Sequence, residues 1–178
     1  LLRELGVRVR TVYFGGGTPT TLSAGQLAWV MEALAGAIDL SGCTEYTVEA
    51  GRPDTITAEK LRVLRDHGAG RISINPQTMD DKVLAAMGRA HTAQDILRAW
   101  DLARESGIPC VNMDLIAGRP ADSRAGFCSS LDQVLELGPE NVTVHTLALK
   151  KGSRLTGALT DGRGAALPSG EDVAAMLD

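Results

Sequence analysis

Hydrophobic and polar positions along the chain alternate between two periods. Apolar residues with helical spacing predict amphipathic helices that begin after the capping residues Ser23, Thr57 and Thr92, and further helices over about 80–88 and 127–138. Between them lie apolar stretches typical of strands, at about 9–14, 45–50, 71–75, 111–116 and 141–148. Residues 1–6 resemble the last turn of a helix, and 171–177 carry a weak helical pattern. Strands that alternate with helices predict right-handed βαβ units and a parallel sheet, an α/β fold.

An open doubly wound sheet and a (βα) barrel both fit this order of elements. The later strands favour the barrel, because each has one apolar and one polar face, whereas the strands of an open sheet covered by helices on both sides are apolar on both faces. The apolar face comprises Val48, Ile72, Ile74, Val111, Met113, Leu115, Val142 and Val144, and the polar face comprises Thr47, Glu49, Ser73, Asn75, Asn112, Asp114, Thr143 and His145. The polar face predicts a ligand cavity at the mouth of the barrel.

The segment Val12–Leu22 joins the first strand to the next helix and contains three consecutive glycines, Gly15, Gly16 and Gly17, followed by Thr18 and Pro19. Glycines permit positive φ angles and let a ligand approach the backbone N–H and C=O groups. A plain tight turn would need a single glycine. The run of three therefore favours a ligand-binding corner between the strand and the helix.

Composition narrows the class of partner. The 178 residues contain 44% hydrophobic and 22% charged residues, which is typical of one globular domain, and no apolar run has the length of a membrane span. A net charge of −4 and only six aromatic residues argue against nucleic-acid binding and favour small molecules as partners. The three cysteines, Cys43, Cys110 and Cys128, are odd in number and far apart, so their spacing predicts neither disulfides nor a metal site, and a reducing cytoplasm is the simplest location.

Ligands of parallel α/β folds lie beyond the carboxyl ends of the strands, where this chain places the glycine corner and then Glu49, Gln77, Asp114 and His145. Two carboxylates and an amide suit a ligand with an ammonium group and ribose hydroxyls, and Arg89 suits a ligand carboxylate.

Competing interpretations remain for several of these residues. Glu49 could pair only with Arg52, His145 is expected to be a core histidine, and His67 and His91 are expected at the surface. Glu49 and Asp114 could instead form the carboxylate pair of a glycosidase, although the glycines have no task in that case. A barrel that binds a phosphorylated ligand at the glycine loop is weaker, because no lysine accompanies the loop.

Five motifs in order resemble the radical S-adenosylmethionine family of oxygen-independent coproporphyrinogen III oxidases, over about residues 5–155. They are Phe-Gly-Gly-Gly-Thr-Pro-Thr at 14–20, Glu-Ala-Gly-Arg-Pro-Asp at 49–54, Arg-Ile-Ser-Ile-Asn-Pro-Gln-Thr at 71–78, Gly-Arg-Ala-His-Thr at 88–92 and Asn-Met-Asp-Leu-Ile-Ala-Gly at 112–118. Residues 49–57 and 144–155 look most like the coproporphyrinogen dehydrogenase branch.

The resemblance implies a partial (βα)6 radical-SAM barrel over residues 1–150, with five strands present and the first βα unit missing, followed by a linker or the start of a C-terminal region over 151–178. It implies S-adenosylmethionine contacts at Gly15, Gly16, Gly17, Thr18 and Glu49. A second set of contacts, which would hold a second cofactor molecule, comprises Gln77, Arg89, Asp114 and Ala148.

Members of the family bind a [4Fe-4S] cluster through a Cys-x3-Cys-x2-Cys loop, and no such loop occurs in these 178 residues. The resemblance therefore implies that the cluster ligands and one more strand lie upstream of Leu1 in a longer parent, and that this fragment alone is inactive. Arg119 also replaces the leucine usual in the Gly-Leu-Pro ending of the last motif.

The implied activity is the oxidative decarboxylation of coproporphyrinogen III propionates to vinyl groups in haem biosynthesis. A 5′-deoxyadenosyl radical would abstract hydrogen from the propionate, and loss of carbon dioxide together with one electron, passed to an acceptor, would leave the vinyl group. Electrons would come from a donor such as flavodoxin or ferredoxin, and no membrane partner is expected. No residue is identified as a catalytic acid or base. The alternative is a haem-binding chaperone of the same family without oxidase activity, which the motifs do not separate from the oxidase.

Overall fold

The structure is a computed structural model that describes residues 6–149, 156–157, 161 and 165–178. The helix end expected at residues 1–6 therefore lies, apart from Gly6, outside the described residues. The described strands are β1 (Thr11–Phe14), β2 (Glu45–Gly51), β3 (Arg71–Gln77), β4 (Cys110–Ala117) and β5 (Asn141–Thr146). The helices are α1 (Ala24–Ala37), α2 (Ala58–Asp66), α3 (Asp81–Ala86), α4 (Ala93–Ser106), α5 (Arg124–Leu137) and α7 (Gly170–Leu177), with short 3-10 helices η1 (Pro19–Thr21) and η2 (Pro53–Thr55).

The predicted alternation of five strands with helices is confirmed, and the strands form one sheet in the order β1-β2-β3-β4-β5. Individual bounds differ from the prediction. Strand β1 begins at Thr11, because the carbonyl of Arg10 accepts from the backbone N–H groups of both Thr44 and Glu45 and so leaves the regular ladder. Strand β3 continues through Pro76 to Gln77, and β5 ends at Thr146.

The chain divides into two compact units. Unit 1 comprises residues 1–75 and 97–112, and unit 2 comprises residues 76–96 and 113–178. In unit 1, β1 pairs with β2 in parallel, with Val12 opposite Tyr46, and β2 pairs with β3, with Val48 opposite Ile72. The register shifts between Glu49 and Gly51, which marks a β-bulge at the carboxyl end of β2.

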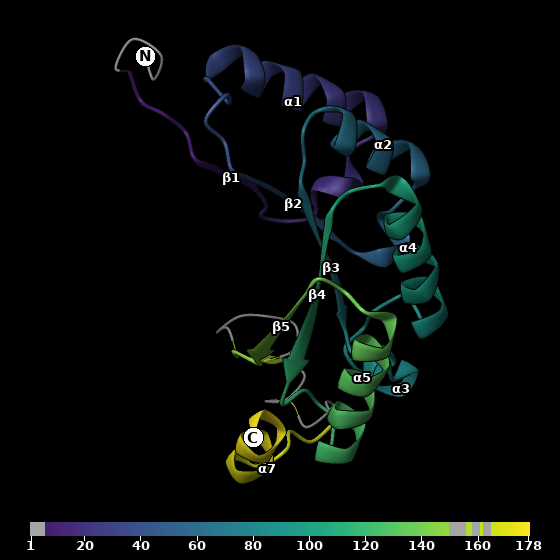
Figure 1. Cartoon of the computed structure of the whole chain (residues 1–178). Coiled ribbons are helices and arrows are strands. Elements are labelled where there is room, and N and C mark those ends of the chain that lie inside the picture. Colours follow the sequence, from purple (N-terminus) through teal and green to yellow (C-terminus); the bar gives the residue numbers. More distant parts are fainter. Residues whose placement is uncertain (1–5, 150–155, 158–160, 162–164) are drawn as a thin grey trace. The chain divides into compact units, whose positions relative to one another are not determined.

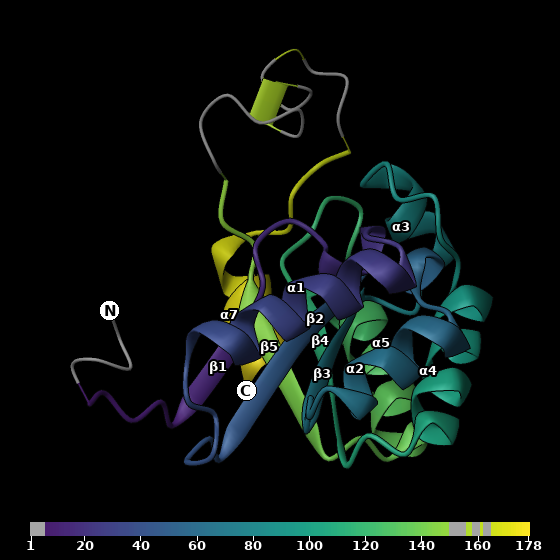
Figure 2. The ribbon, with the colours of Figure 1, turned by 90° about the horizontal axis from the view of Figure 1, so that it is seen from above.

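Helices α1 and α2 of unit 1 lie side by side on one face of the sheet formed by β1, β2 and β3 (Figure 1, Figure 2). The predicted capping box begins α1, since Ser23 Oγ accepts from the Gln26 N–H and Gln26 Oε1 accepts from the Ser23 N–H. Thr57 caps α2. Apolar residues of α1, α2, β2 and β3 form a fully buried core of Leu27, Val48, Leu61, Leu64 and Ile72.

In unit 2, helix α7 packs against α5, and its Met176 is buried. The weak helical pattern at 171–177 is thus confirmed as a helix, which Ser169 and Asp172 begin with a reciprocal capping box. Those hydrogen bonds from Ser169 lower the pKa of the Asp172 carboxyl. The predicted domain boundary at residue 150 stays a prediction.

Arg119 is the largest fully buried side chain of the described residues. Its Nη2 lies 3.2 Å from Asp122 Oδ2, and both side chains are inaccessible to solvent. Burial lowers the pKa of the Arg119 guanidinium, while the charge of Asp122 and its hydrogen bond oppose that shift. Where the family pattern has a leucine, this chain therefore has a buried ion pair beside the N-terminus of α5.

Two expectations about histidines are wrong. His145 is exposed on β5, at the end of the sheet order, and does not belong to the core. His91 is buried just before α4, although it was expected at the surface. The neighbouring Thr92 and Asp95 form the predicted cap, in which the Asp95 carboxylate accepts from the Thr92 N–H and hydroxyl.

Candidate functional site

The three glycines that follow β1 meet two different requirements. Gly16 and Gly17 have φ angles of 83° and 70°, and no atom lies within 4 Å of a Cβ built on either of them. Both are exposed, so their backbone faces open space. Gly15 has no positive φ, but a Cβ there would lie 2.4 Å from Tyr13 Cε1 and 2.9 Å from Glu49 Cδ. The loop is thus bare on one side and tightly contacted on the other.

Glu49 lies against this loop from the carboxyl end of β2. Its Oε1 accepts from the Tyr13 hydroxyl at 2.5 Å, and its Oε2 accepts from the Gly16 N–H at 3.3 Å. The β-bulge that begins at Glu49 disturbs the regular pairing there, a feature that often re-aims a side chain beside a site. The alternative in which Glu49 pairs only with Arg52 is wrong, because Arg52 pairs with Asp54 instead, with 3.7 Å between Arg52 Nε and Asp54 Oδ1.

A buried threonine fastens the loop to the end of β2. Thr20 Oγ1 donates to the Ala50 carbonyl at 2.7 Å and lies 2.6 Å from Thr55 Oγ1. Lys60, from α2, donates its Nζ to the carbonyls of Thr20 at 2.6 Å and Thr55 at 3.0 Å. These contacts tie η1, β2 and η2 together, so the glycine loop has a rigid base.

Sequence reasoning missed Tyr13, Thr20 and Lys60. For Thr20, the run of hydroxyl residues after the glycines was a possible signal in the sequence. For Lys60 there was no local signal, because it comes 40 positions after Thr20, the residue that it contacts. The structure also places a lysine beneath the glycine loop, which the sequence did not predict. Its ammonium group donates to two backbone carbonyls and so serves to hold the loop.

Thr18 and Gly51 meet where the loop crosses the end of β2. The φ of Gly51 is 53°, and a Cβ built on it would lie 3.0 Å from Thr18 Cγ2. A side chain at position 51 would therefore displace Thr18 and strain the backbone. In unit 1 the structure brings Gly15, Gly16, Thr18 and Glu49 into one corner.

The polar face of the strands is mostly buried in unit 1. Thr47 is fully buried, and the Asn112 side-chain amide donates to Ser73 Oγ at 2.8 Å. Ser73 and Asn112 thus hydrogen-bond each other inside the protein, and this part of the polar face serves packing rather than ligand contact. Among the polar residues of β2, Glu49 is the one that reaches the glycine corner.

The second predicted set lies in unit 2. Gln77 ends β3 with a φ of 67°, an unusual conformation for a residue with a side chain, and its buried Oε1 has no hydrogen-bond partner within the described part of the chain. Strain together with an unsatisfied buried acceptor is typical of a ligand contact. Asp114 is one-fifth exposed on β4, and its Oδ2 lies 4.0 Å from His145 Nε2.

Arg89 and Ala148 occupy less informative positions. Arg89 is half-buried after α3, where its backbone N–H donates to the Leu84 carbonyl at 3.0 Å. Ala148 is exposed, two residues after the end of β5. That these residues act together with Gln77 and Asp114 on one ligand stays a prediction.

The chain's own residues fit the two family cofactors differently. The open glycine backbone and the Glu49 carboxylate fit a ligand such as S-adenosylmethionine, which offers hydroxyl and ammonium donors. An iron–sulfur cluster does not fit the described residues, since none of them form a group of three or more metal-binding side chains. Cys43 lies before β2, Cys110 begins β4 and Cys128 is exposed on α5.

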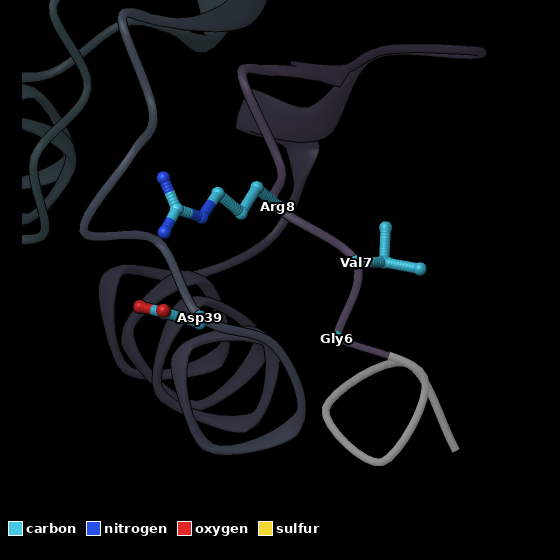
Figure 3. Close-up of a pocket in the computed structure, with 4 residues that line it drawn as sticks. All are labelled: Gly6, Val7, Arg8 and Asp39. Atoms are coloured by element: carbon cyan, nitrogen blue, oxygen red, sulfur yellow. The ribbon is translucent and has the colours of Figure 1, made fainter.

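A cavity of about 610 Å³ lies at the other end of β1, away from the glycine loop. Gly6, Val7, Arg8 and Asp39 line it. Figure 3 shows Arg8 and Asp39 on one side of the chain, with Val7 directed away from them. Gly6, Val7 and Arg8 precede β1, and Asp39 precedes β2. Because ligands of parallel α/β folds lie beyond the carboxyl ends of the strands, we do not assign the site to this cavity.

Comparison with known proteins identifies the class. Residues 1–131 match the radical SAM superfamily, and the chain belongs to this superfamily, whose members use S-adenosylmethionine and a [4Fe-4S] cluster. In the solved structures, the chain is similar to coproporphyrinogen III oxidase (HemN) from Escherichia coli, with a TM-score of 0.79 and 28% identity over 95% of this chain and 38% of that one. The predicted partial barrel of parallel strands is thereby confirmed as the radical SAM fold.

Two curated relatives have names that indicate a more specific activity than the superfamily does. The chain is 45% identical to the "Oxygen-independent coproporphyrinogen-III oxidase-like protein HemZ" of Bacillus subtilis, over 87% of this chain and 31% of the relative. It is 33% identical to the "Heme chaperone HemW" of the same organism, over 96% of this chain and 45% of the relative. The chain thus spans less than half the length of these relatives. None of its described helices has the length and apolar character needed to cross a membrane.

Proposed function

We propose that this chain forms the S-adenosylmethionine-binding strands of a longer radical SAM protein that acts on coproporphyrinogen III in haem biosynthesis. The proposed reaction is the oxygen-independent oxidative decarboxylation of propionate side chains to vinyl groups. The observation that carries the proposal is the corner formed by Gly15, Gly16, Thr18 and Glu49, which offers open backbone and an oriented carboxylate. The likeness to HemZ and HemN supports the substrate.

Each part of the corner has a definite task in this proposal. The bare loop at Gly16 and Gly17 lets the cofactor approach the backbone, and Glu49 accepts hydrogen bonds from its hydroxyl or ammonium groups. Thr20 and Lys60 keep the loop in place, so that little conformational entropy is lost on binding. When bound, S-adenosylmethionine supplies a radical that abstracts a hydrogen atom from the substrate. The chain's residues bind and orient the cofactor.

The residues of unit 2 extend the proposal to a second cofactor molecule. Gln77, Arg89, Asp114 and Ala148 would form its contacts. The unsatisfied Oε1 of Gln77 and its strained backbone support this role, because a ligand donor would satisfy the buried acceptor. Asp114 contributes a second carboxylate for a cationic group.

A haem-binding chaperone is the second candidate. The 33% identity with HemW, over almost the whole chain, favours it independently of the oxidase relatives. A chaperone would keep the cofactor corner but would not decarboxylate a propionate. An electron donor of the flavodoxin or ferredoxin type, and a cytoplasmic location, remain predictions under either candidate.

The two candidates separate in one experiment on the full-length protein with its cluster assembled anaerobically. Coproporphyrinogen III, S-adenosylmethionine and a reductant are supplied, and protoporphyrinogen IX is measured by chromatography alongside 5′-deoxyadenosine. Haem binding is titrated in parallel by absorption spectroscopy. Vinyl products that require S-adenosylmethionine support the oxidase. Stoichiometric haem binding without vinyl products contradicts the oxidase and supports the chaperone.

A further inference from the structure

Tyr13 is the last residue but one of β1, and 61% of its surface is exposed. A large aromatic side chain with so much exposed surface contributes little to a core. Its hydroxyl nevertheless donates a short hydrogen bond of 2.5 Å to Glu49 Oε1 in the glycine corner. The side chain thus contributes to the corner rather than to packing.

The strand register explains how the two side chains meet. Tyr13 lies opposite Thr47 in the parallel pairing of β1 with β2, and Glu49 follows two positions after Thr47. Residues two apart on a strand face the same side, so Tyr13 and Glu49 share one face of the sheet. The phenol ring then crosses Gly15, where a Cβ would lie 2.4 Å from its Cε1. The missing side chain at Gly15 is what allows this contact.

The hydrogen bond from Tyr13 helps to fix the orientation of the Glu49 carboxylate. Glu49 receives one donor on each oxygen, from Tyr13 and from the Gly16 N–H. A carboxylate has about four acceptor positions, so those left can still accept from a ligand. With both oxygens held, the side chain is already oriented when a ligand arrives, and the entropy of ordering a glutamate side chain is not lost on binding.

From this geometry we infer that Tyr13 is a positioning residue, which orients Glu49 for the hydroxyl or ammonium donors of S-adenosylmethionine without being required to touch the cofactor. The inference rests on the proposed cofactor site at Glu49. It assigns a role to a residue outside the five motifs that carry the family resemblance, which begin at Phe14.

The test uses Tyr13→Phe in the full-length protein with its cluster assembled, and calorimetric titration of S-adenosylmethionine. Losing an exposed hydrogen bond that acts through Glu49 should weaken binding about 3- to 10-fold. The chain contains one other tyrosine, Tyr46, whose buried hydroxyl has no hydrogen-bond partner within the described residues. Tyr46→Phe removes the same atom from the same unit and should leave the affinity unchanged.

A double-mutant cycle separates positioning from other roles. In a Glu49→Ala background the Tyr13 hydroxyl has no carboxylate to hold, so adding Tyr13→Phe should cause no further loss of affinity. A structural or direct ligand-contacting hydroxyl would weaken binding equally in both backgrounds, which overturns the inference. A ring that stacks on the ligand would leave Tyr13→Phe unaffected, which overturns it as well.

Failure of the inference is distinguishable from failure of the proposed site. If Glu49→Ala weakens S-adenosylmethionine binding and Tyr13→Phe does not, Tyr13 has no positioning role and the site stands. If Glu49→Ala itself binds normally, the cofactor site is wrongly placed and the inference falls with it. Absorption of the assembled cluster in each variant verifies that the protein compared is folded and loaded.

Discussion

Replacing Glu49 with glutamine tests the centre of the proposed site. Two donors converge on this side chain, the Tyr13 hydroxyl and the Gly16 N–H, one at each oxygen. A glutamine keeps the shape but has one acceptor oxygen, and its NH2 group must face the other donor. The variant therefore loses the negative charge and at least one hydrogen bond, because the glutamine NH2 group faces a donor, either the Tyr13 hydroxyl or the Gly16 N–H.

The magnitude follows from the kind of interaction lost. A hydrogen bond to a charged group contributes about 1.5–3 kcal/mol, so S-adenosylmethionine should bind roughly 10- to 150-fold more weakly. Glu49 is partly exposed, which favours the lower half of this range. Calorimetric titration into the full-length protein measures the affinity directly. The cluster should still assemble, because no cluster ligand is altered.

Glu45→Gln is the matched control. Glu45 lies on the same strand, β2, at its exposed amino end, where its Oε1 accepts from Thr47 Oγ1. The same loss of charge there should leave cofactor affinity unchanged, because ligands lie beyond the carboxyl ends of the strands. Unchanged affinity in Glu49→Gln, or an equal loss in both variants, would refute the reasoning that places the cofactor at this corner.

Three further predictions address other parts of the chain. Asp114→Asn should weaken a second S-adenosylmethionine binding event roughly 10- to 150-fold in a two-site titration, and a single unaffected site would contradict the two-molecule arrangement. Thr20→Val removes a buried hydroxyl and should lower the free energy of unfolding, measured with urea, by about 1–3 kcal/mol; the exposed Thr21→Val should cost less. Arg119→Leu leaves Asp122 buried without its cation and should cost about 3–5 kcal/mol in the same assay, whereas replacing both should be far less harmful.

Much of the fold follows from the sequence because its determinants are local. The helical spacing of apolar residues and the capping residues Ser23 and Thr57 act within a few positions, and the structure contains the helices that they predict. Strand ends were less predictable, since they depend on pairing. The β-bulge after Glu49 and the continuation of β3 through Pro76 arise from the register between neighbouring strands, which no local pattern encodes.

Site residues were predictable where a residue with suitable chemistry directly follows a predicted strand. Glu49 and the glycines were found because they follow strands directly. Tyr13 and Lys60 were missed because their contacts join residues 36 and 40 positions apart. The histidines were misplaced for a related reason, since residue type alone does not distinguish a buried imidazole such as that of His91 from an exposed one such as that of His145.

The run of three glycines shows how several physical requirements can produce one motif. Gly16 and Gly17 need positive φ angles, which other residues adopt at a cost, whereas Gly15 needs only the absence of a Cβ. A tight turn would require the first property at one position. Here the absence of a Cβ at Gly15 allows the Tyr13 phenol and the Glu49 carboxylate to lie against the backbone. The positive φ angles leave Gly16 and Gly17 facing open space. The three glycines thus provide both an exposed backbone, at Gly16 and Gly17, and room for the Glu49 carboxylate beside it. A tight turn would not need both of these together.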